Sequence, residues 1–417
     1  MQLRRVVVTG LGAVTPLGNS VSDYWNNLIN GVSGTVLITR FDASKFKTKF
    51  ACEVKGFKPE DYFDKKEARK LDAFCHYGIA SAVQAVTDSA IDLQNHNPDR
   101  IGVIWGSGIG GLYTFQAEAF AFAKGDGTPR FNPFFIPKMI SDICSGHISI
   151  RFNFRGPNFT TCSACASSTN AMIDAFNYIR LGKADIIVTG GSEAAVNESG
   201  VGGFNAMQAL STRNDSPQTA SRPFDKDRDG FVLGEGGGCL ILEDLEHAIK
   251  RGAKIYAEVV GGGMSADAHH MTAPHPEGLG AINVMKSALA DAGMNADEID
   301  YINVHGTSTP LGDIAESKAI KSVFAENAYK LNISSTKSMT GHLLGAAGAI
   351  EAIACILAVK NDIVPPTINH FTDDPEFDPK LNFTFNKAQK RTVRAALSNT
   401  FGFGRHNASV IVKKYNS

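Results

Sequence analysis

Two cysteines stand three residues apart in the stretch Thr160 to Ser168, which reads Thr-Thr-Cys-Ser-Ala-Cys-Ala-Ser-Ser. The flanking sequence makes the second of them, Cys165, the better candidate for chemistry. Residues 148–159 are predicted to be extended, and residues 170–181 carry apolar residues at helical spacing. A thiol at such a strand-to-helix turn lies near the positive end of a helix and near free backbone N–H groups. This setting favours the thiolate and can hold an oxyanion, as nucleophilic catalysis requires.

Three polar stretches follow predicted strands in the second half of the chain: Asn303 to Asp313, Ser334 to His342, and Ser398 to Gly404. Strand ends of this kind face the ligand crevice in open α/β sheets. Four side chains are therefore candidates to converge with Cys165: His305, Lys337, His342 and Phe403. A cysteine with two histidines could also bind zinc, but the usual ligand spacing is absent and we expect no metal.

Two other motifs suggest different chemistry. Residues Gly106 to Gly111 match the dinucleotide pattern G-x-G-x-x-G, which keeps a nicotinamide- or flavin-dependent oxidoreductase open as a hypothesis. The match is weak because a phenylalanine-rich segment follows, where a second strand with an acidic residue should stand. Cys162 and Cys165 also form C-x-x-C, a redox signature, although a thioredoxin-like module is much shorter than this chain.

Composition limits the class of protein. The chain has 417 residues, with 41 basic and 42 acidic side chains and a formal charge of −1, so nothing global indicates binding to nucleic acid or an anionic membrane. Seven cysteines without a regular framework indicate free thiols in a reducing compartment. We expect no membrane-spanning stretch, and residues 1–5 run straight into a predicted strand without the pattern of a signal peptide. A cytoplasmic location is expected.

The order of strand, glycine-rich turn, helix and strand occurs twice along the chain. The second occurrence begins near Lys254, so we divide the chain into residues 1–253 and 254–417. A duplicated α/β unit with stacked layers is the predicted architecture. In the first half, residues 64–77 are predicted to be a helix whose early turns carry a basic cluster: Lys65, Lys66, Arg69 and Lys70.

Several strings together resemble one family over nearly the whole chain. They are Val8 to Pro16, Gly200 to Phe204, Ala209 to Asp215, His305 to Pro310, Lys337 to Gly348, and Phe401 to Gly404. The chain resembles the β-ketoacyl-acyl-carrier-protein synthases of fatty acid synthesis, and among them the type II elongating synthases. This resemblance implies the thiolase fold, with two βαβαβαββ halves in five α-β-α-β-α layers. It also implies a homodimer, an acyl carrier protein as partner, and no cofactor.

The resemblance assigns roles to individual residues. It implies a catalytic triad of Cys165, His305 and His342, in which the second histidine is typical of elongation. Cys165 would accept the acyl group, whose carbonyl oxygen the backbone N–H groups of Cys165 and Phe403 would hold. The histidines would stabilise the enolate left when malonyl-thioester loses carbon dioxide. The resemblance further implies that Lys337, paired with Glu351, sets the electrostatics of the site. Phe403 would be the gate, and Ile109 and Phe204 would line the acyl pocket beside it. Thr307 and Thr309 would contact the pantetheine arm, and the basic cluster would dock the carrier protein.

Two departures from the family pattern stand out. Arg405 and His406 follow the glycine-rich loop where relatives generally have small residues, so acyl selectivity and gate motion are less safely inherited. Cys162 is an extra thiol, either silent or able to form a disulfide with Cys165. Two alternative functions stay open: a condensing enzyme of a secondary polyene or polyketide pathway, and a non-catalytic partner subunit that sets chain length.

Overall fold

A single ten-stranded sheet runs through the molecule, and its two halves have the same strand order. The computed structural model describes residues 3–416, so Met1, Gln2 and Ser417 lie outside the described residues. The first half has the order β5-β4-β6-β7-β1 and the second β10-β9-β13-β14-β8. In both halves the first three strands are parallel and the last two antiparallel. The two halves join where β1 pairs with β8, which confirms the predicted duplication.

The strands of the first half are β1 (Val6–Val14), β4 (Ile101–Gly106), β5 (Asn158–Thr161), β6 (Ile186–Glu193) and β7 (Gly236–Asp244). Those of the second half are β8 (Ala257–Ala266), β9 (Tyr301–Asn303), β10 (Asn332–Ser334), β13 (Ala395–Phe401) and β14 (His406–Lys413). The short pairs β2 (Val36–Leu37) with β3 (Phe50–Ala51), and β11 (Ile363–Val364) with β12 (Gln389–Lys390), lie outside this sheet.

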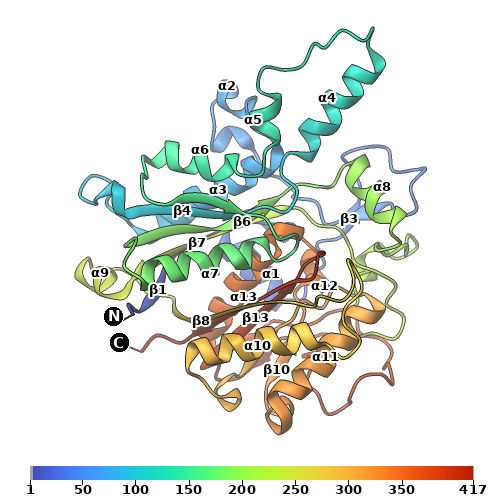
Figure 1. Ribbon diagram of the computed structural model, residues 1–417. Helices are drawn as coiled ribbons and strands as arrows, with labels where there is room; N and C mark the ends of the chain where they lie inside the picture. Colours follow the sequence, from blue (N-terminus) through green and yellow to red (C-terminus); the bar gives the residue numbers. More distant parts are fainter. Residues whose placement is uncertain (1–2, 417) are drawn as a thin grey trace.

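The two halves of the sheet form two layers of the molecule, and helices form three more, one between the halves and one on each outer face (Figure 1). α7 (Ser167–Arg180) and α13 (Ala347–Asn361) lie between the two halves of the sheet and contact strands of both. α3 (Ala73–Ser89) covers the outer face of the first half, and α10 (Leu279–Ala292) with α11 (Pro310–Phe324) covers that of the second. The molecule therefore has the five α-β-α-β-α layers of the thiolase fold, as predicted.

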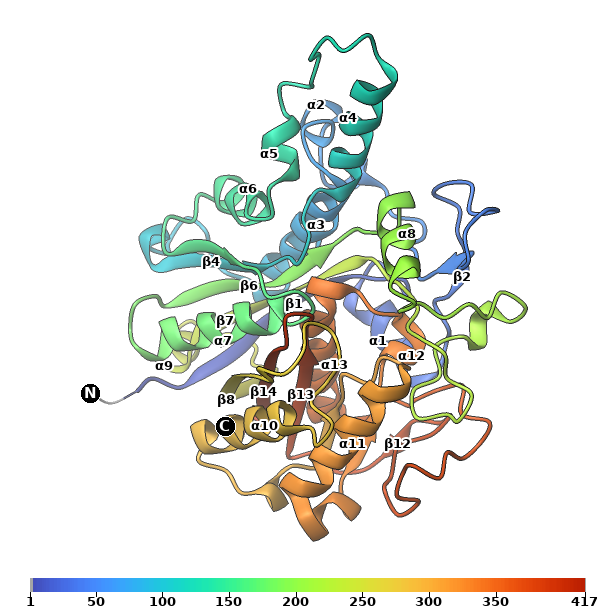
Figure 2. The same cartoon turned by 45° about the vertical axis from the view of Figure 1, so that its right-hand side comes forward.

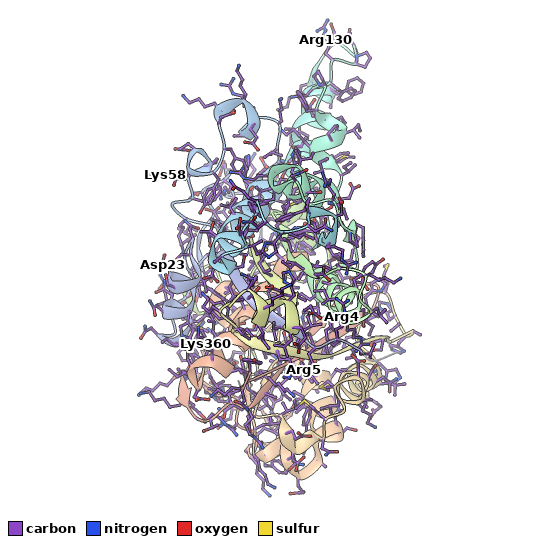
Figure 3. All side chains as sticks on the ribbon, turned by 90° about the vertical axis from the view of Figure 1, so that its left-hand side faces the viewer. Arg4, Arg5, Asp23, Lys58, Arg130 and Lys360 are labelled. Atoms are coloured by element: carbon purple, nitrogen blue, oxygen red, sulfur yellow. The ribbon has the colours of Figure 1, made fainter. Side chains whose placement is uncertain are left out.

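Shorter helices complete the chain: α1 (Val21–Ile29), α2 (Lys65–Ala68), α4 (Leu112–Lys124), α5 (Phe135–Met139), α6 (Ile143–Phe152), α8 (Glu198–Ala206), α9 (Leu245–Lys250) and α12 (Lys337–Thr340). α4 and α5 form an arm that projects from the body of the molecule (Figure 2). Arg130 lies near the tip of this arm (Figure 3).

Two secondary-structure predictions are wrong. Residues 148–152, predicted to be extended, belong to helix α6, where Cys144 and Ile148 are buried one turn apart, and β5 begins only at Asn158. Residues 148–152 read Ile-Ser-Ile-Arg-Phe, and this alternation of apolar and polar residues is typical of a strand. In the helix, Ile148 is buried whereas Ile150 is 77% exposed. Residues 64–77 are not one helix: α2 ends at Ala68, and Asp72 starts α3 by accepting a hydrogen bond from the N–H of Phe74.

The core helix α13 also corrects the expectation about membrane spans. Residues Leu344–Asn361 are long and apolar enough to cross a membrane, although we expected no such stretch. In the fold, 89% of this segment is buried inside the protein. Its alanines and glycines allow it to pack closely between the two halves of the sheet.

Candidate active site

A sharp turn between β5 and α7 carries Cys165. Ala164 has a φ of +49°, in the left-handed region. The Ser167 hydroxyl accepts a hydrogen bond from the Ser163 N–H (2.9 Å) and donates one to the Ala164 carbonyl (2.6 Å). Gly402 packs against this turn: a Cβ on it would lie 2.6 Å from the Ser163 carbonyl oxygen. These contacts fix Cys165 immediately before the first turn of α7.

The sulfur of Cys165 faces a histidine and a backbone donor. Its Sγ lies 3.0 Å from Nε2 of His342, and the backbone N–H of Phe403 donates to it. Burial raises the pKa of the Cys165 thiol to about 12, although the charge of Lys337 and the Phe403 N–H oppose this increase. Burial outweighs the helix terminus, so the prediction that this position favours the thiolate is wrong. The resting group is a thiol beside an imidazole that can take its proton.

His305 and His342 form a pair of neutral imidazoles. Their ring centroids are 5.2 Å apart and the rings are nearly perpendicular, at 87°. The pKa of each lies well below the usual value, first because of burial and then because of the positive charge of Lys337. Two neutral rings at this spacing can both donate hydrogen bonds to one carbonyl oxygen between them.

Lys337 and Glu351 form a buried ion pair behind the histidines. Lys337 begins α12 and Glu351 lies in α13, and their side chains are 1% and 0% exposed. Burial raises the pKa of Glu351 to about 7, while Lys337 opposes the rise. The predicted pairing is therefore present. Its cation stabilises nearby negative charge and helps keep both imidazoles neutral.

Two buried glutamates that sequence reasoning missed hold the site loops. Glu316 in α11 accepts hydrogen bonds from the backbone N–H groups of His305 (2.9 Å) and Gly306 (2.8 Å). Glu193, at the end of β6, accepts from the N–H groups of residues 108, 109, 110 and 345. The position of Glu193 at the end of a buried strand could have marked it as a site residue in the sequence. No local pattern distinguishes Glu316.

Most of the predicted side chains meet at one cavity of about 640 Å³. Its lining includes Cys165, His305, His342, Phe403, Ile109, Phe204, Thr307, Thr309 and Arg405. The rings of Phe204 and Phe403 have centroids 6.4 Å apart, and Thr307 and Thr309 share a hydroxyl contact of 3.0 Å. The wall is mostly apolar around a few polar groups, which is typical of a site for a ligand with a long apolar part.

The four basic docking candidates lie away from this cavity. Lys65 and Lys66 are exposed in α2, and Arg69 and Lys70 are exposed just after it. The ammonium of Lys70 lies 5.3 Å from the ring centroid of Phe134, at the foot of the α4–α5 arm. The cluster is therefore available at the surface, although only Lys65 and Lys66 are helical.

The glycine loop at residues 106–111 has no free donors for a dinucleotide phosphate. Three of its N–H groups, those of Gly108, Ile109 and Gly110, already bond the carboxylate of Glu193. A pyrophosphate would need these same donors. The two cysteines of the C-x-x-C motif differ in their surroundings. Cys162 is exposed while Cys165 is buried, and both are free thiols.

Comparison with known proteins identifies the family. Residues 3–248 match the family Beta-ketoacyl synthase, N-terminal domain, and residues 256–371 match Beta-ketoacyl synthase, C-terminal domain. The chain belongs to the beta-ketoacyl synthase family, which confirms the resemblance found in the motifs.

Curated relatives agree over the full length. The chain is 48% identical over 415 residues to 3-oxoacyl-[acyl-carrier-protein] synthase 2 of Synechocystis sp., with coverage of 100% of this chain and 99% of the relative. It is 49% identical over 414 residues to the protein of the same name from Staphylococcus aureus, covering 99% of each.

Solved structures show the same fold. The ishigamide ketosynthase/chain length factor superposes with a TM-score of 0.93 at 35% identity, covering 99% of this chain and 100% of that one. A type II PKS acyl-carrier protein in complex with its ketosynthase gives a TM-score of 0.90 at 33% identity, covering 100% of both chains.

Proposed function

We propose that this protein is a 3-oxoacyl-[acyl-carrier-protein] synthase 2, which joins a cysteine-bound acyl chain to malonyl carrier protein in fatty acid elongation. The observation that carries the proposal is the 3.0 Å contact between Cys165 Sγ and His342 Nε2, with His305 in the same cavity. The relatives that share this name over their full length support it.

In the first half-reaction the acyl group moves from the carrier to Cys165. His342 takes the thiol proton as the sulfur attacks the thioester carbon, and the carrier sulfur leaves with that proton. The carbonyl oxygen gains negative charge in the process. We expect the backbone N–H groups of Cys165 and Phe403 to hold it, since the Phe403 N–H donates to the sulfur and the other N–H belongs to the nucleophile itself.

In the second half-reaction malonyl carrier protein loses carbon dioxide. The electrons of the broken C–C bond form an enolate, whose oxygen accepts hydrogen bonds from His305 and His342. The α-carbon then attacks the acyl-Cys165 carbonyl, which gives 3-oxoacyl carrier protein and releases the cysteine. Lys337, paired with Glu351, provides positive charge behind the imidazoles and acts as a positioning residue.

The cavity walls fit the two substrates. Ile109, Phe204 and Phe403 form an apolar surface beside Cys165 for the acyl chain, with Phe403 as the gate. Thr307 and Thr309 offer hydroxyls to the amides of a pantetheine arm.

The basic cluster is the proposed landing site for the acidic carrier protein. The four exposed cations lie within six consecutive residues, where they would attract opposite charge. The solved ketosynthase in complex with its acyl-carrier protein, at 33% identity, supports a carrier as partner.

A homodimer is proposed from two unpartnered features. β5 is an edge strand of the ten-stranded sheet, and an exposed row of N–H and C=O groups invites pairing. The α4–α5 arm exposes large apolar side chains, including Phe115, Phe120 and Ile136.

We also propose that the chain divides between residues 253 and 254, because the second copy of the strand order begins at Ala257. A cytoplasmic location is proposed because all seven cysteines are free thiols.

A non-catalytic chain-length subunit is the less suitable alternative. Such a subunit needs no reactive cysteine, whereas Cys165 here faces His342 at hydrogen-bond distance. The test is incubation of the purified protein with acyl and malonyl carrier proteins. Wild type should form 3-oxoacyl carrier protein and Cys165→Ala should not. A silent wild type, or an active variant, would overturn the proposal.

A further inference from the structure

The catalytic cavity contains a cation that neither half-reaction uses. Arg405 follows the Phe401–Gly404 stretch and lines the same cavity as Cys165 and His305. The residue is only 9% exposed, and its charge helps to lower the pKa of His305. A buried guanidinium at this place requires an explanation, since burying a charge is costly and Asp267 is its one ionic partner among residues 3–416.

The backbone at this residue does not favour arginine. Arg405 has a φ of +62°, in the left-handed region that glycine adopts without strain. Its N–H bonds the Gly402 carbonyl (2.9 Å), and its carbonyl accepts from the Asp267 N–H (3.2 Å). These contacts hold the backbone and would form equally well with a glycine, so they do not account for the side chain.

Hydrogen bonding within the protein leaves the guanidinium unsatisfied. Its Nε is buried and has no hydrogen-bond partner among residues 3–416. The facing carboxylate of Asp267 lies 3.8 Å from Nε, which is within ion-pair range but beyond hydrogen-bond distance. That carboxylate is occupied by other donors, the Asn407 side chain (2.7 Å) and the His275 N–H (3.1 Å).

The other two acidic residues of the cavity wall, Glu316 and Asp229, accept hydrogen bonds from backbone N–H groups. Glu316 bonds the backbone of His305 and Gly306, and Asp229 accepts from the Thr212 N–H at 3.1 Å. Arg405 is thus a cation with unused donors in a largely apolar cavity. A planar guanidinium with free N–H groups is suited to bind a carboxylate.

We propose that Arg405 binds the carboxylate of the malonyl unit and so selects malonyl-loaded carriers over carriers with uncharged acyl groups. This inference rests on the proposed function, which brings a carboxylate into this cavity beside His305. The contact exists only before bond cleavage, because the C–C electrons pass to the enolate and the departing carbon dioxide is neutral. Arg405 therefore contributes to substrate binding and does not accelerate decarboxylation.

The test measures binding without chemistry. Two pantetheine probes in which an amide replaces the thioester, one malonyl and one acetyl, are titrated into wild type, Arg405→Gln and Arg405→Lys. Wild type should bind the malonyl probe about tenfold or more tightly than the acetyl probe, as expected for a hydrogen bond between charged groups. Arg405→Gln should lose this preference. Arg405→Lys, which has the same backbone strain and keeps the charge, should retain part of it.

Steady-state kinetics give a second readout. Arg405→Gln should raise KM for malonyl carrier protein and raise kcat with it, so that kcat/KM changes little, because the lost contact stabilises the bound substrate and is absent from the transition state. Arg405→Gln should change KM for malonyl carrier protein by a larger factor than it changes the rate of acyl transfer to Cys165, since the transfer step involves no carboxylate. An equal probe preference in wild type and Arg405→Gln would overturn the inference, even if wild type makes 3-oxoacyl product; failure to make product would instead count against the proposed function.

Discussion

At the scale of single residues, the reactivity of Cys165 results from two opposing influences. Burial disfavours the thiolate, while Lys337 and the Phe403 N–H favour it, and the effect of burial is the largest of the three. The thiol needs a base only when it attacks, and His342 is placed to act as that base. Its own lowered pKa keeps it neutral and able to accept the proton.

This balance predicts the pH dependence of alkylation. With a pKa of about 12, the thiolate fraction of Cys165 grows roughly tenfold per pH unit over the whole range below that value. In Cys162→Ala, alkylation by iodoacetamide, followed by mass spectrometry, should still be rising between pH 8 and pH 10. Cys165→Ala reports the exposed Cys162 alone as a control. A plateau reached below pH 8 would show that the sulfur is already a thiolate in the resting enzyme.

Short strings predicted side chains that meet at the cavity, because Cys165, His305 and His342 stand in motifs with distinctive neighbours. The residues that hold them were not predictable in this way. Glu316 meets the backbone of His305 only through the packing of α11, and Asp267 meets Arg405 only through the pairing of β8 with β14. The thiolate was wrongly predicted for the same reason, since burial depends on the whole fold.

At the scale of elements, the close approach of α7 and α13 positions the site. α7 begins just after Cys165, and α13 carries Glu351. The distance between the two helices therefore sets the distance between the cysteine and the ion pair. Gly348 of α13 lies against Thr169 of α7: a Cβ on it would be 2.0 Å from the Thr169 Oγ1 and 3.0 Å from its backbone nitrogen.

Replacement of this glycine should therefore destabilise the protein. Gly348→Ala places a methyl group where no space exists and should lower the free energy of unfolding by about 1–3 kcal/mol. Gly203→Ala is the matched control, because Gly203 is an exposed helical residue of α8 whose added Cβ would meet nothing within 4 Å. It should raise the free energy by about 0.5–1 kcal/mol. Urea unfolding measures both, and equal effects would contradict the packing account.

The element scale also shows where sequence patterns are weakest. The second occurrence of the strand, glycine-rich turn and helix, predicted to begin near Lys254, begins with β8 at Ala257. Residues 148–152 were wrongly predicted to be extended, since apolar and polar residues alternate over these five positions with the period of a strand. The break between α2 and α3 depends on Asp72, whose carboxylate also accepts from Thr114 in the distant helix α4.

At the scale of the whole molecule, the cavity and the docking surface are separate. The catalytic residues lie between the two halves of the fold, whereas Lys65, Lys66, Arg69 and Lys70 lie on the outer surface near the α4–α5 arm. A carrier protein bound there would contact the enzyme through surface charge and deliver its substrate through the pantetheine arm. The two contributions should be separable by experiment.

Charge reversal at the docking surface should affect carrier substrates only. Lys65→Glu with Lys66→Glu should raise KM for malonyl carrier protein about tenfold at low salt, with a smaller effect at high salt, because exposed charge pairs are weak and screened. KM for malonyl-pantetheine should not change. The control pair, Lys286→Glu with Lys318→Glu, alters exposed lysines of α10 and α11 in the opposite outer layer. A similar KM increase in the control would contradict a specific docking surface.

The central claim is that Cys165 carries the acyl chain between the two half-reactions, and mass spectrometry tests it directly. After incubation with acyl carrier protein, intact mass should show one added acyl group, and peptide mapping should place it on Cys165 and not on Cys162. Malonyl carrier protein should then remove this group as 3-oxoacyl carrier protein. Product formation without an adduct on Cys165, or an adduct that malonyl carrier protein does not discharge, would contradict the account.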